Sequence, residues 1–249
     1  MLRLADRHRL VFYDQRGGGR SRHHDDRSTI TWASLVAELA LVARELAISP
    51  LSIVGYSFGG LLALLYSVEV AADRLDGPVP ERLILIDPAP ITREHRRAFE
   101  SEFARRQSSP AVQSLRDDLA TSGLRERDPE AYRQRAFELS VAGYFADPAR
   151  AHDLTPFRVT GRVQRSGWES LGDFDLRESL RAVQAPALVV HGREDPIPLA
   201  SSEDIAAALP RARLVVLDHS GHVPYVEAPA ALFDAIDHFL AETGTNQLS

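Results

Sequence analysis

Short apolar runs alternate along the chain with longer segments in which apolar residues recur at helical spacing. The run Arg82–Ile86 predicts a buried strand, whereas the pattern of Trp32–Ile48 predicts an amphipathic helix that begins after Thr31. Strands that alternate with helices are typical of a doubly wound, mostly parallel sheet covered on both faces, so the expected fold class is α/β. The other expected strands are Arg9–Tyr13, Leu51–Gly55, Ala187–Val190 and Leu214–Leu217, and the other expected helices are Phe58–Ala72, Ser202–Leu209 and Pro229–Ala241.

This alternation stops in the middle of the chain. Residues 91–180 are charged, rich in arginine and mostly helical in pattern, with breaks at prolines and glycines. Strand and helix patterns resume after this segment. We therefore expect a core formed by residues 1–90 and 181–249, with residues 91–180 inserted as a helical cap.

Composition excludes several classes of chemistry. The chain has no cysteine, which removes thiol nucleophiles, disulfides and cysteine-based metal sites. All 29 residues counted as Lys+Arg are arginine, which removes Walker-A phosphate loops, Schiff-base lysines and Ser–Lys nucleophile pairs. A net charge of −6 gives no overall field that would attract nucleic acid. We expect neither a metal nor an organic cofactor.

Nothing at the N-terminus resembles a secretory signal, so cytosol is the expected compartment. The uncharged stretch Leu46–Val68 is long enough on paper to cross a membrane. Pro50 and several glycines interrupt this stretch, however, and its pattern changes from strand to helix at Ser57. We therefore expect no membrane partner.

A serine between two glycines carries the main chemical signal. The sequence Gly55-Tyr56-Ser57-Phe58-Gly59-Gly60 lies between an expected strand and an expected helix, which is the context that gives a G-x-S-x-G pattern its meaning. A serine on such a tight turn has a strained backbone and projects its hydroxyl above the sheet, while flanking glycines let strand and helix approach. The Phe58 N–H, at the helix N-terminus, would stabilise an oxyanion.

A serine nucleophile requires a general base, and the base requires a carboxylate that orients it. Two later loops follow expected strands and supply both types of residue, in the chain order serine, acid, histidine. Carboxyl ends of parallel strands gather at one rim of a sheet, so these loops should meet Ser57. Spacing alone leaves Asp195, Glu194 and Asp218 as candidate acids, and His222 and His219 as candidate bases.

One further histidine and two short segments are expected to have structural rather than chemical roles. His191 is expected beneath the acid loop rather than in contact with substrate. His23-His24-Asp25-Asp26 resembles a metal site superficially, but adjacent loop residues rarely converge on one ion, so we expect these side chains to be solvated. Gly17-Gly18-Gly19 lacks the continuation of a phosphate loop and is expected to be a turn that requires positive φ.

With these motifs in place, the chain resembles the α/β-hydrolase family over most of its length. Gly55–Gly60 is similar to the family's nucleophile elbow, and the resemblance implies Ser57 as nucleophile, Asp195 as acid and His222 as base. The segment 12–21 resembles the proline iminopeptidase branch, although that branch usually has tryptophan where this chain has Phe58.

The chain also departs from the family pattern. Family members normally begin with two or three strands before the one expected at Arg9–Tyr13, and carry a His-Gly loop that provides a second oxyanion donor. Neither is found in this sequence. A lost strand would leave facing sheet edges unpaired. We therefore expect that Met1 is not the natural start, or that the sequence is a fragment.

The expected activity is hydrolysis of an ester or amide bond of a small substrate through an acyl-enzyme, with Ser57, Asp195 and His222 as catalytic residues and Phe58 in the oxyanion hole. An aminopeptidase of the proline iminopeptidase type would also need a carboxylate for the substrate's ammonium group, for which Glu138 and Glu169 are candidates. The alternatives are a catalytically impaired binding protein, and a cofactor-free C–C hydrolase or perhydrolase. Substrate identity and oligomeric state are not determined by the sequence.

Overall fold

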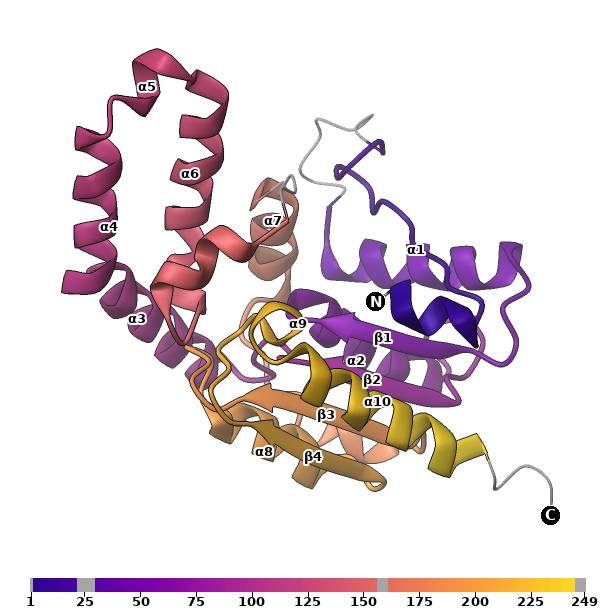
Figure 1. Ribbon diagram of the computed structural model, residues 1–249. Coiled ribbons are helices and arrows are strands. Elements are labelled where there is room, and N and C mark those ends of the chain that lie inside the picture. Colours follow the sequence, from indigo (N-terminus) through magenta and orange to yellow (C-terminus); the bar gives the residue numbers. More distant parts are fainter. Residues whose placement is uncertain (1, 22–29, 156–160, 245–249) are drawn as a thin grey trace.

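The computed structural model describes residues 2–21, 30–155 and 161–244 and has a parallel sheet of four strands in the order β1-β2-β3-β4 (Figure 1). Each strand pairs with the next in parallel register; Val54, for example, lies opposite Ile84, and Ile84 opposite Leu188. The predicted α/β class is confirmed. The strands are β1 (Ser52–Tyr56), β2 (Arg82–Ile86), β3 (Ala187–Gly192) and β4 (Ala212–Leu217).

The two central strands are buried on both faces of the sheet. Successive side chains of a strand point to opposite sides, so neighbouring residues enter different cores. Leu83 and Leu85 of β2 pack into one hydrophobic core, whereas Ile84 and Ile86 pack into another. This explains why β2 and β3 read as continuous apolar runs rather than as alternating ones.

Helices cover both faces of the sheet (Figure 1). On one face α2 lies against β1 and α1 packs on α2, while α8 contacts β3 and β4. On the other face Leu4 and the apolar side of α10 complete the second core. The bounds are η1 (Leu2–Asp6), α1 (Trp32–Glu45), α2 (Phe58–Ala71), η5 (Ser179–Ala182), α8 (Leu199–Ala208), α9 (Pro224–Glu227) and α10 (Pro229–Gly244).

The described residues between β2 and η5 are largely helical and extend away from the sheet in Figure 1. Val112, Ala142 and Phe145 belong to a separate small core in this segment, which also takes up Val223 from the loop after β4. The division into core and cap stays a prediction. The elements are α3 (Arg93–Gln107), α4 (Pro110–Thr121), α5 (Leu124–Arg127), α6 (Pro129–Val141), η3 (Ala142–Tyr144), η4 (Pro148–Asp153) and α7 (Gly161–Leu171).

One expected strand is absent from the structure. Residues 9–13 have no regular secondary structure, so the prediction of a strand at Arg9–Tyr13 is wrong. A strand requires a hydrogen-bonded neighbour, and a groove of about 360 Å³ lies between this segment and β1, lined by Leu10 and Phe12 on one side and by Ile53 and Val54 on the other. Val54 therefore remains 40% exposed at the sheet edge.

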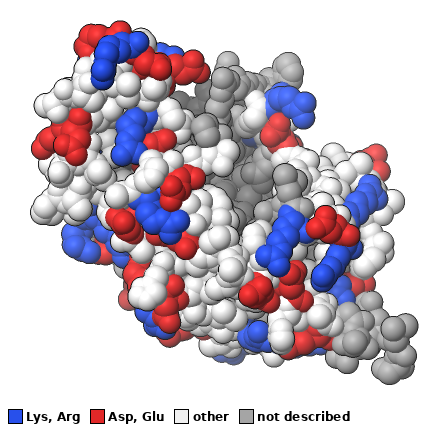
Figure 2. Space-filling view, viewed as in Figure 1, with Lys and Arg blue, Asp and Glu red and all other residues white. Residues whose placement is uncertain are grey.

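The surface charge bears on the expectation about nucleic acid, and the helix lengths bear on the expectation about membranes. Acidic and basic side chains intermingle on the face shown in Figure 2, and no large field of one sign is visible there. In the part of the chain that the structure describes, no helix is long and apolar enough to cross a membrane. The uncharged stretch Leu46–Val68 includes the whole of β1 and most of α2.

Candidate active site

Ser57 occupies the single-residue turn between β1 and α2. Its backbone has φ 53° and ψ −121°, a region that L-residues rarely adopt. Backbone hydrogen bonds hold this conformation: the Ser57 N–H donates to the Ile86 carbonyl at 3.0 Å, and the shortest bonds to the Ser57 carbonyl come from Gly60 and Ala89, each at 2.9 Å. The strained residue is thus held by β2 as well as by its own helix.

The glycines around Ser57 are not equivalent. A Cβ on Gly55 would lie 2.5 Å from the Gly59 carbonyl oxygen, and one on Gly60 would lie 2.9 Å from Pro88 Cβ. A Cβ on Gly59 would have no neighbour within 4 Å. The expectation that both glycines flanking the serine allow close approach is therefore correct for Gly55 and wrong for Gly59, because the helix meets its neighbours one residue later, at Gly60.

His222 lies between Ser57 and Asp195. Its Nε2 is 2.8 Å from Ser57 Oγ, and its Nδ1 is 2.7 Å from Asp195 Oδ2. Asp195 follows β3 and accepts a second hydrogen bond, from the Ile197 N–H to Oδ1 at 2.7 Å. The rim of the sheet thus brings together three side chains that are far apart in the sequence, at hydrogen-bonding distances.

Burial sets the electrostatics of this group. His222 is 3% exposed and Asp195 is 6% exposed. Burial lowers the pKa of His222 and raises the pKa of Asp195. A neutral imidazole with a hydrogen bond from Nδ1–H to a carboxylate has Nε2 free to accept the serine proton.

The competing candidates lie elsewhere. Glu194 Oε2 accepts the Ser220 N–H at 3.0 Å, which is a loop contact. Asp218 pairs with Arg193 on the surface, and His219 is exposed. None of these three side chains has a hydrogen bond with Ser57 or His222 in the described part of the chain.

Aromatic residues that sequence reasoning missed surround the imidazole. Tyr56 and Tyr144 place their rings 5.2 and 4.8 Å from the His222 ring, and the Tyr56 hydroxyl donates to the His222 carbonyl at 2.8 Å. Tyr56 is part of the serine motif and could have been noted. Tyr144 has no sequence signal, because it lies in the helical segment and no pattern relates it to the loop after β4.

A carboxylate also holds the histidine loop. Glu227 accepts the Gly221 N–H at 2.7 Å through Oε2 and the Ala146 N–H at 2.8 Å through Oε1. Burial raises the pKa of Glu227, while these two N–H groups lower it. Glu227 thereby links the loop that carries His222 to the helical segment.

A cavity of about 480 Å³ opens at Ser57. Phe58 is the first residue of α2, so its N–H has no partner within the helix and is available to a ligand. The Phe58 ring packs against Trp168 of α7, with centroids 5.3 Å apart. The cavity is lined by Tyr13, Asp14, Gln15, Gly18, Gly19, Tyr56, Ser57, Phe58, Gly59, Val163 and Gln164.

The glycine-rich turn has the conformation that its sequence predicts. Gly17 and Gly19 have φ of 77° and 47°, as expected for a turn that requires positive φ. The segment His23-His24-Asp25-Asp26, which we expected to be solvated, falls in the gap at 22–29 between described residues.

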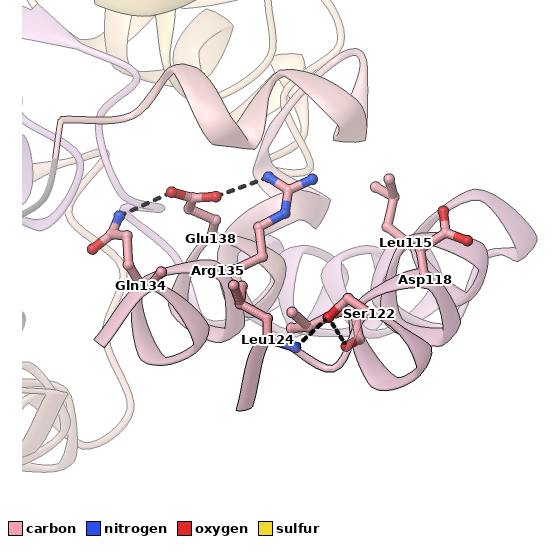
Figure 3. A pocket seen from close by; sticks show the side chains of 9 residues that line it. Leu115, Asp118, Ser122, Leu124, Gln134, Arg135 and Glu138 are labelled. Atoms are coloured by element: carbon pink, nitrogen blue, oxygen red, sulfur yellow. Dashed lines mark hydrogen bonds and ion pairs between the residues drawn. The ribbon is translucent and has the colours of Figure 1, made fainter. Parts of the chain in front are cut away.

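Neither carboxylate proposed for an ammonium group lines this cavity. Glu138 lies in a separate pocket between α4 and α6, where Gln134 and Arg135 bind its two oxygens at 3.0 and 2.8 Å (Figure 3). Glu169 is exposed on α7. The helical pattern placed both residues on helices, but it could not show which way those helices face.

His191 is fully buried beneath the acid loop, as expected. Its Nδ1 is 2.9 Å from Ser202 Oγ and its Nε2 is 3.1 Å from the Ile197 carbonyl oxygen. His191, Asp87 and Asp195 place possible metal-ligand atoms within 4.8 Å of one another. Both nitrogens of His191 and both oxygens of Asp195 are already engaged in hydrogen bonds, so we assign this cluster to the hydrogen-bond network of the site.

Known proteins match this chain over most of its length. The model of the Alpha/beta hydrolase family matches residues 1–235. The chain belongs to the α/β hydrolase family. This α/β hydrolase is 29% identical to a proline iminopeptidase of Xanthomonas citri over 261 residues, which covers 94% of the chain and 81% of that protein.

Other relatives of this α/β hydrolase carry a different name. A pimeloyl-acyl-carrier-protein methyl ester esterase of Nitrosomonas europaea is 29% identical over 245 residues, covering 94% of the chain and 86% of that protein. Among solved structures, an alpha/beta fold family hydrolase from Bacillus anthracis matches with a TM-score of 0.63 and 22% identity, covering 92% of this chain and 80% of that one. The structural match supports the fold.

Proposed function

We propose that this α/β hydrolase cleaves an ester or amide bond of a small substrate through an acyl-enzyme. Ser57 is the nucleophile, His222 the general base and Asp195 the acid that orients the base. The observation that carries the proposal is the position of one buried imidazole, 2.8 Å from a serine hydroxyl and 2.7 Å from a carboxylate.

The proposed reaction has two halves. Ser57 Oγ attacks the substrate carbonyl carbon while His222 Nε2 takes the serine proton, and the same proton is then given to the leaving alcohol or amine as its bond breaks. A water molecule next attacks the acyl carbon and gives a proton to His222. His222 returns that proton to Ser57 as the acid product leaves, so the enzyme is restored.

The developing oxyanion requires preorganised donors. The Phe58 N–H, at the start of α2, supplies one in this proposal, and the helix dipole adds to it. Tyr13–Gln15 also line the cavity that opens at Ser57, so in this proposal their loop faces the bound acyl group.

A fluorophosphonate probe tests the proposal directly, because it reacts with an activated serine. We expect stoichiometric labelling of the native protein at Ser57 and none in Ser57→Ala. Ser114→Ala, which changes an exposed serine of α4, is the matched control and should label fully. Absence of labelling in the native protein, or labelling that persists in Ser57→Ala, would refute an activated Ser57.

The finer proposal concerns the bond that is cleaved. Similarity to a proline iminopeptidase and to a methyl ester esterase supports amides and esters alike. An aminopeptidase must bind the free ammonium group of its substrate, and among the described residues that line the cavity Asp14 carries the one carboxylate. We propose that Asp14 binds this ammonium group if aminoacyl compounds are substrates.

Turnover of proline p-nitroanilide and p-nitrophenyl butyrate by the native protein and by Asp14→Asn tests this step. An aminopeptidase should lose at least tenfold in kcat/KM for the anilide and little for the ester. Equal losses for both substrates, or no turnover of the anilide, would exclude Asp14 as the ammonium site and favour the esterase.

A further inference from the structure

Asp87 is a second buried carboxyl group at the site. It follows β2 with φ 42° and has no exposed surface. Its Oδ1 accepts the Gly192 N–H at 2.8 Å, whereas its Oδ2 has no N–H or O–H donor among the residues that the structure describes. A buried carboxylate oxygen without a donor is costly, so the charged form of Asp87 is disfavoured.

Asp195 accepts hydrogen bonds on both carboxylate oxygens, unlike Asp87. Both of its oxygens accept hydrogen bonds, from the Ile197 N–H and from His222 Nδ1. One carboxyl oxygen of Asp87 and one of Asp195 also lie within 4.8 Å of each other. Two carboxylates so close in a dry interior do not both ionise, and the proton stays with the group that is less well solvated by donors.

We propose, on the basis of the function proposed above, that Asp87 is a positioning residue which stays protonated and donates a hydrogen bond from Oδ2 to the Asp195 carboxylate. The two carboxyl groups then share one proton and carry one negative charge. Once protonated, Oδ2 no longer requires a donor, because its O–H has the Asp195 carboxylate as acceptor. The bond also holds Asp195 in the orientation that fixes the His222 tautomer. Asp87 does not line the substrate cavity, and the hydrogen bond that its side chain makes among the described residues goes to Gly192 and not to Ser57.

The surroundings of Asp87 favour its neutral form. Burial and the neighbouring Asp195 raise the pKa of Asp87 well above its usual value. The nearby ring of His191 is held neutral because burial lowers its pKa to about 4. The titratable groups that face Asp87 are Asp195 after β3, His191 on β3, His222 after β4, Tyr56 on β1 and Tyr225 on α9.

Two substitutions of Asp87 test whether it acts as a hydrogen-bond donor to Asp195. Asparagine has the shape of protonated aspartate, tolerates positive φ, and can accept from Gly192 while it donates to Asp195. Asp87→Gly also adopts φ 42° without strain but has no donor. With p-nitrophenyl butyrate we expect Asp87→Gly to lose at least tenfold in kcat/KM, and Asp87→Asn to restore the rate to within about threefold of the native protein.

Two kinetic outcomes would overturn the proposal. If Asp87→Asn loses as much activity as Asp195→Asn, Asp87 acts as a carboxylate. If Asp87→Gly is as active as the native protein, Asp87 positions nothing.

Thermal unfolding gives a readout that does not depend on turnover. A carboxyl group whose folded pKa is raised makes the protein lose stability as pH rises from the unfolded pKa, near 4, toward the folded value. Asp87→Asn does not titrate. The Tm of Asp87→Asn minus that of the native protein should therefore increase between pH 4.5 and 8, by at least about 3 °C.

The direction of this change decides the proposal independently of the proposed hydrolysis. A Tm difference that stays constant or decreases over the same pH range would show that Asp87 is ionised in the folded protein, and would overturn the inference. Asp218→Asn, which changes a surface carboxylate, serves as the matched control. If no ester or amide is turned over, the Tm series still supports or refutes the shared proton.

Discussion

Tyr144 and His222 are joined by two contacts. The His222 N–H donates to the Tyr144 carbonyl oxygen at 2.7 Å, and the two rings stack with centroids 4.8 Å apart and planes 28° from parallel. Tyr144 belongs to η3, so the helical segment fixes both the backbone and the ring of the proposed general base. The orientation of His222 therefore depends on Tyr144, which has no hydrogen bond with Ser57 or Asp195 among the described residues.

The ring contact should be measurable apart from the backbone contact. Tyr144→Phe keeps the stacked ring, whereas Tyr144→Ala removes it and leaves the carbonyl. Because aromatic pairs contribute about 0.5–1.5 kcal/mol, we expect Tyr144→Ala to lower kcat by up to about tenfold and Tyr144→Phe to remain close to the native value. Ester hydrolysis checks this, and equal rates for both variants would contradict a positioning role of the ring.

Asp195 should be the carboxylate on which activity depends. Replacing the acid of such a triad by asparagine stabilises the wrong imidazole tautomer and typically costs about 10⁴ in kcat, which is the loss we expect for Asp195→Asn. Glu194→Gln retains an acceptor for Ser220, and Asp218→Asn changes an exposed side chain, so both should keep the native rate. A large loss in either control, with an active Asp195→Asn, would reassign the acid.

The two glycines of the serine motif should respond differently to alanine. Gly55→Ala would place a Cβ 2.5 Å from a backbone oxygen, so the turn must move, and we expect a destabilisation of about 3 kcal/mol or more. Gly59→Ala meets no atom within 4 Å and gains helix propensity, so stability should stay equal or rise by up to about 1 kcal/mol. Urea unfolding of both variants checks this contrast, and similar losses would contradict it.

His191 should make the protein sensitive to acid. Burial lowers its pKa to about 4, and the neighbouring His222 adds to this because two adjacent imidazoles disfavour a second positive charge, whereas an unfolded histidine titrates near 6.5. Between these values the unfolded state binds a proton that the folded state does not. The free energy of unfolding should therefore fall by up to about 1.4 kcal/mol for each unit that pH drops from 6.5 toward 4.

His191→Gln tests this, since glutamine does not titrate. Its free energy of unfolding should depend less on pH between 6.5 and 4.5 than that of the native protein. His238→Gln, which changes an exposed histidine of α10, is the control and should keep the native slope. Parallel curves for the native protein and His191→Gln would contradict a neutral, buried His191.

Local pattern was sufficient for most of the fold. β2 is apolar enough to be found at its observed bounds, and α2 begins at Phe58 as predicted, because both elements are specified by neighbouring residues. The prediction of a strand at Arg9–Tyr13 was wrong because a strand depends on residues far away in the sequence. A strand is stable only beside a partner, and no run of apolar residues reveals whether a neighbouring strand is present.

Sequence by itself established the α/β class, the serine at a strand-to-helix turn, and two later loops that could supply an acid and a base. The spacing of residues left three carboxylates and two histidines open, and the resemblance to a family implied Asp195 and His222. Only the tertiary structure places His222 beside Ser57 and Asp195 beside His222, because His219 and His222 differ in burial rather than in local pattern. It also revealed Tyr144 and Asp87. Their contacts join segments far apart in the chain, and such contacts depend on how the elements pack, which the spacing of residues does not record.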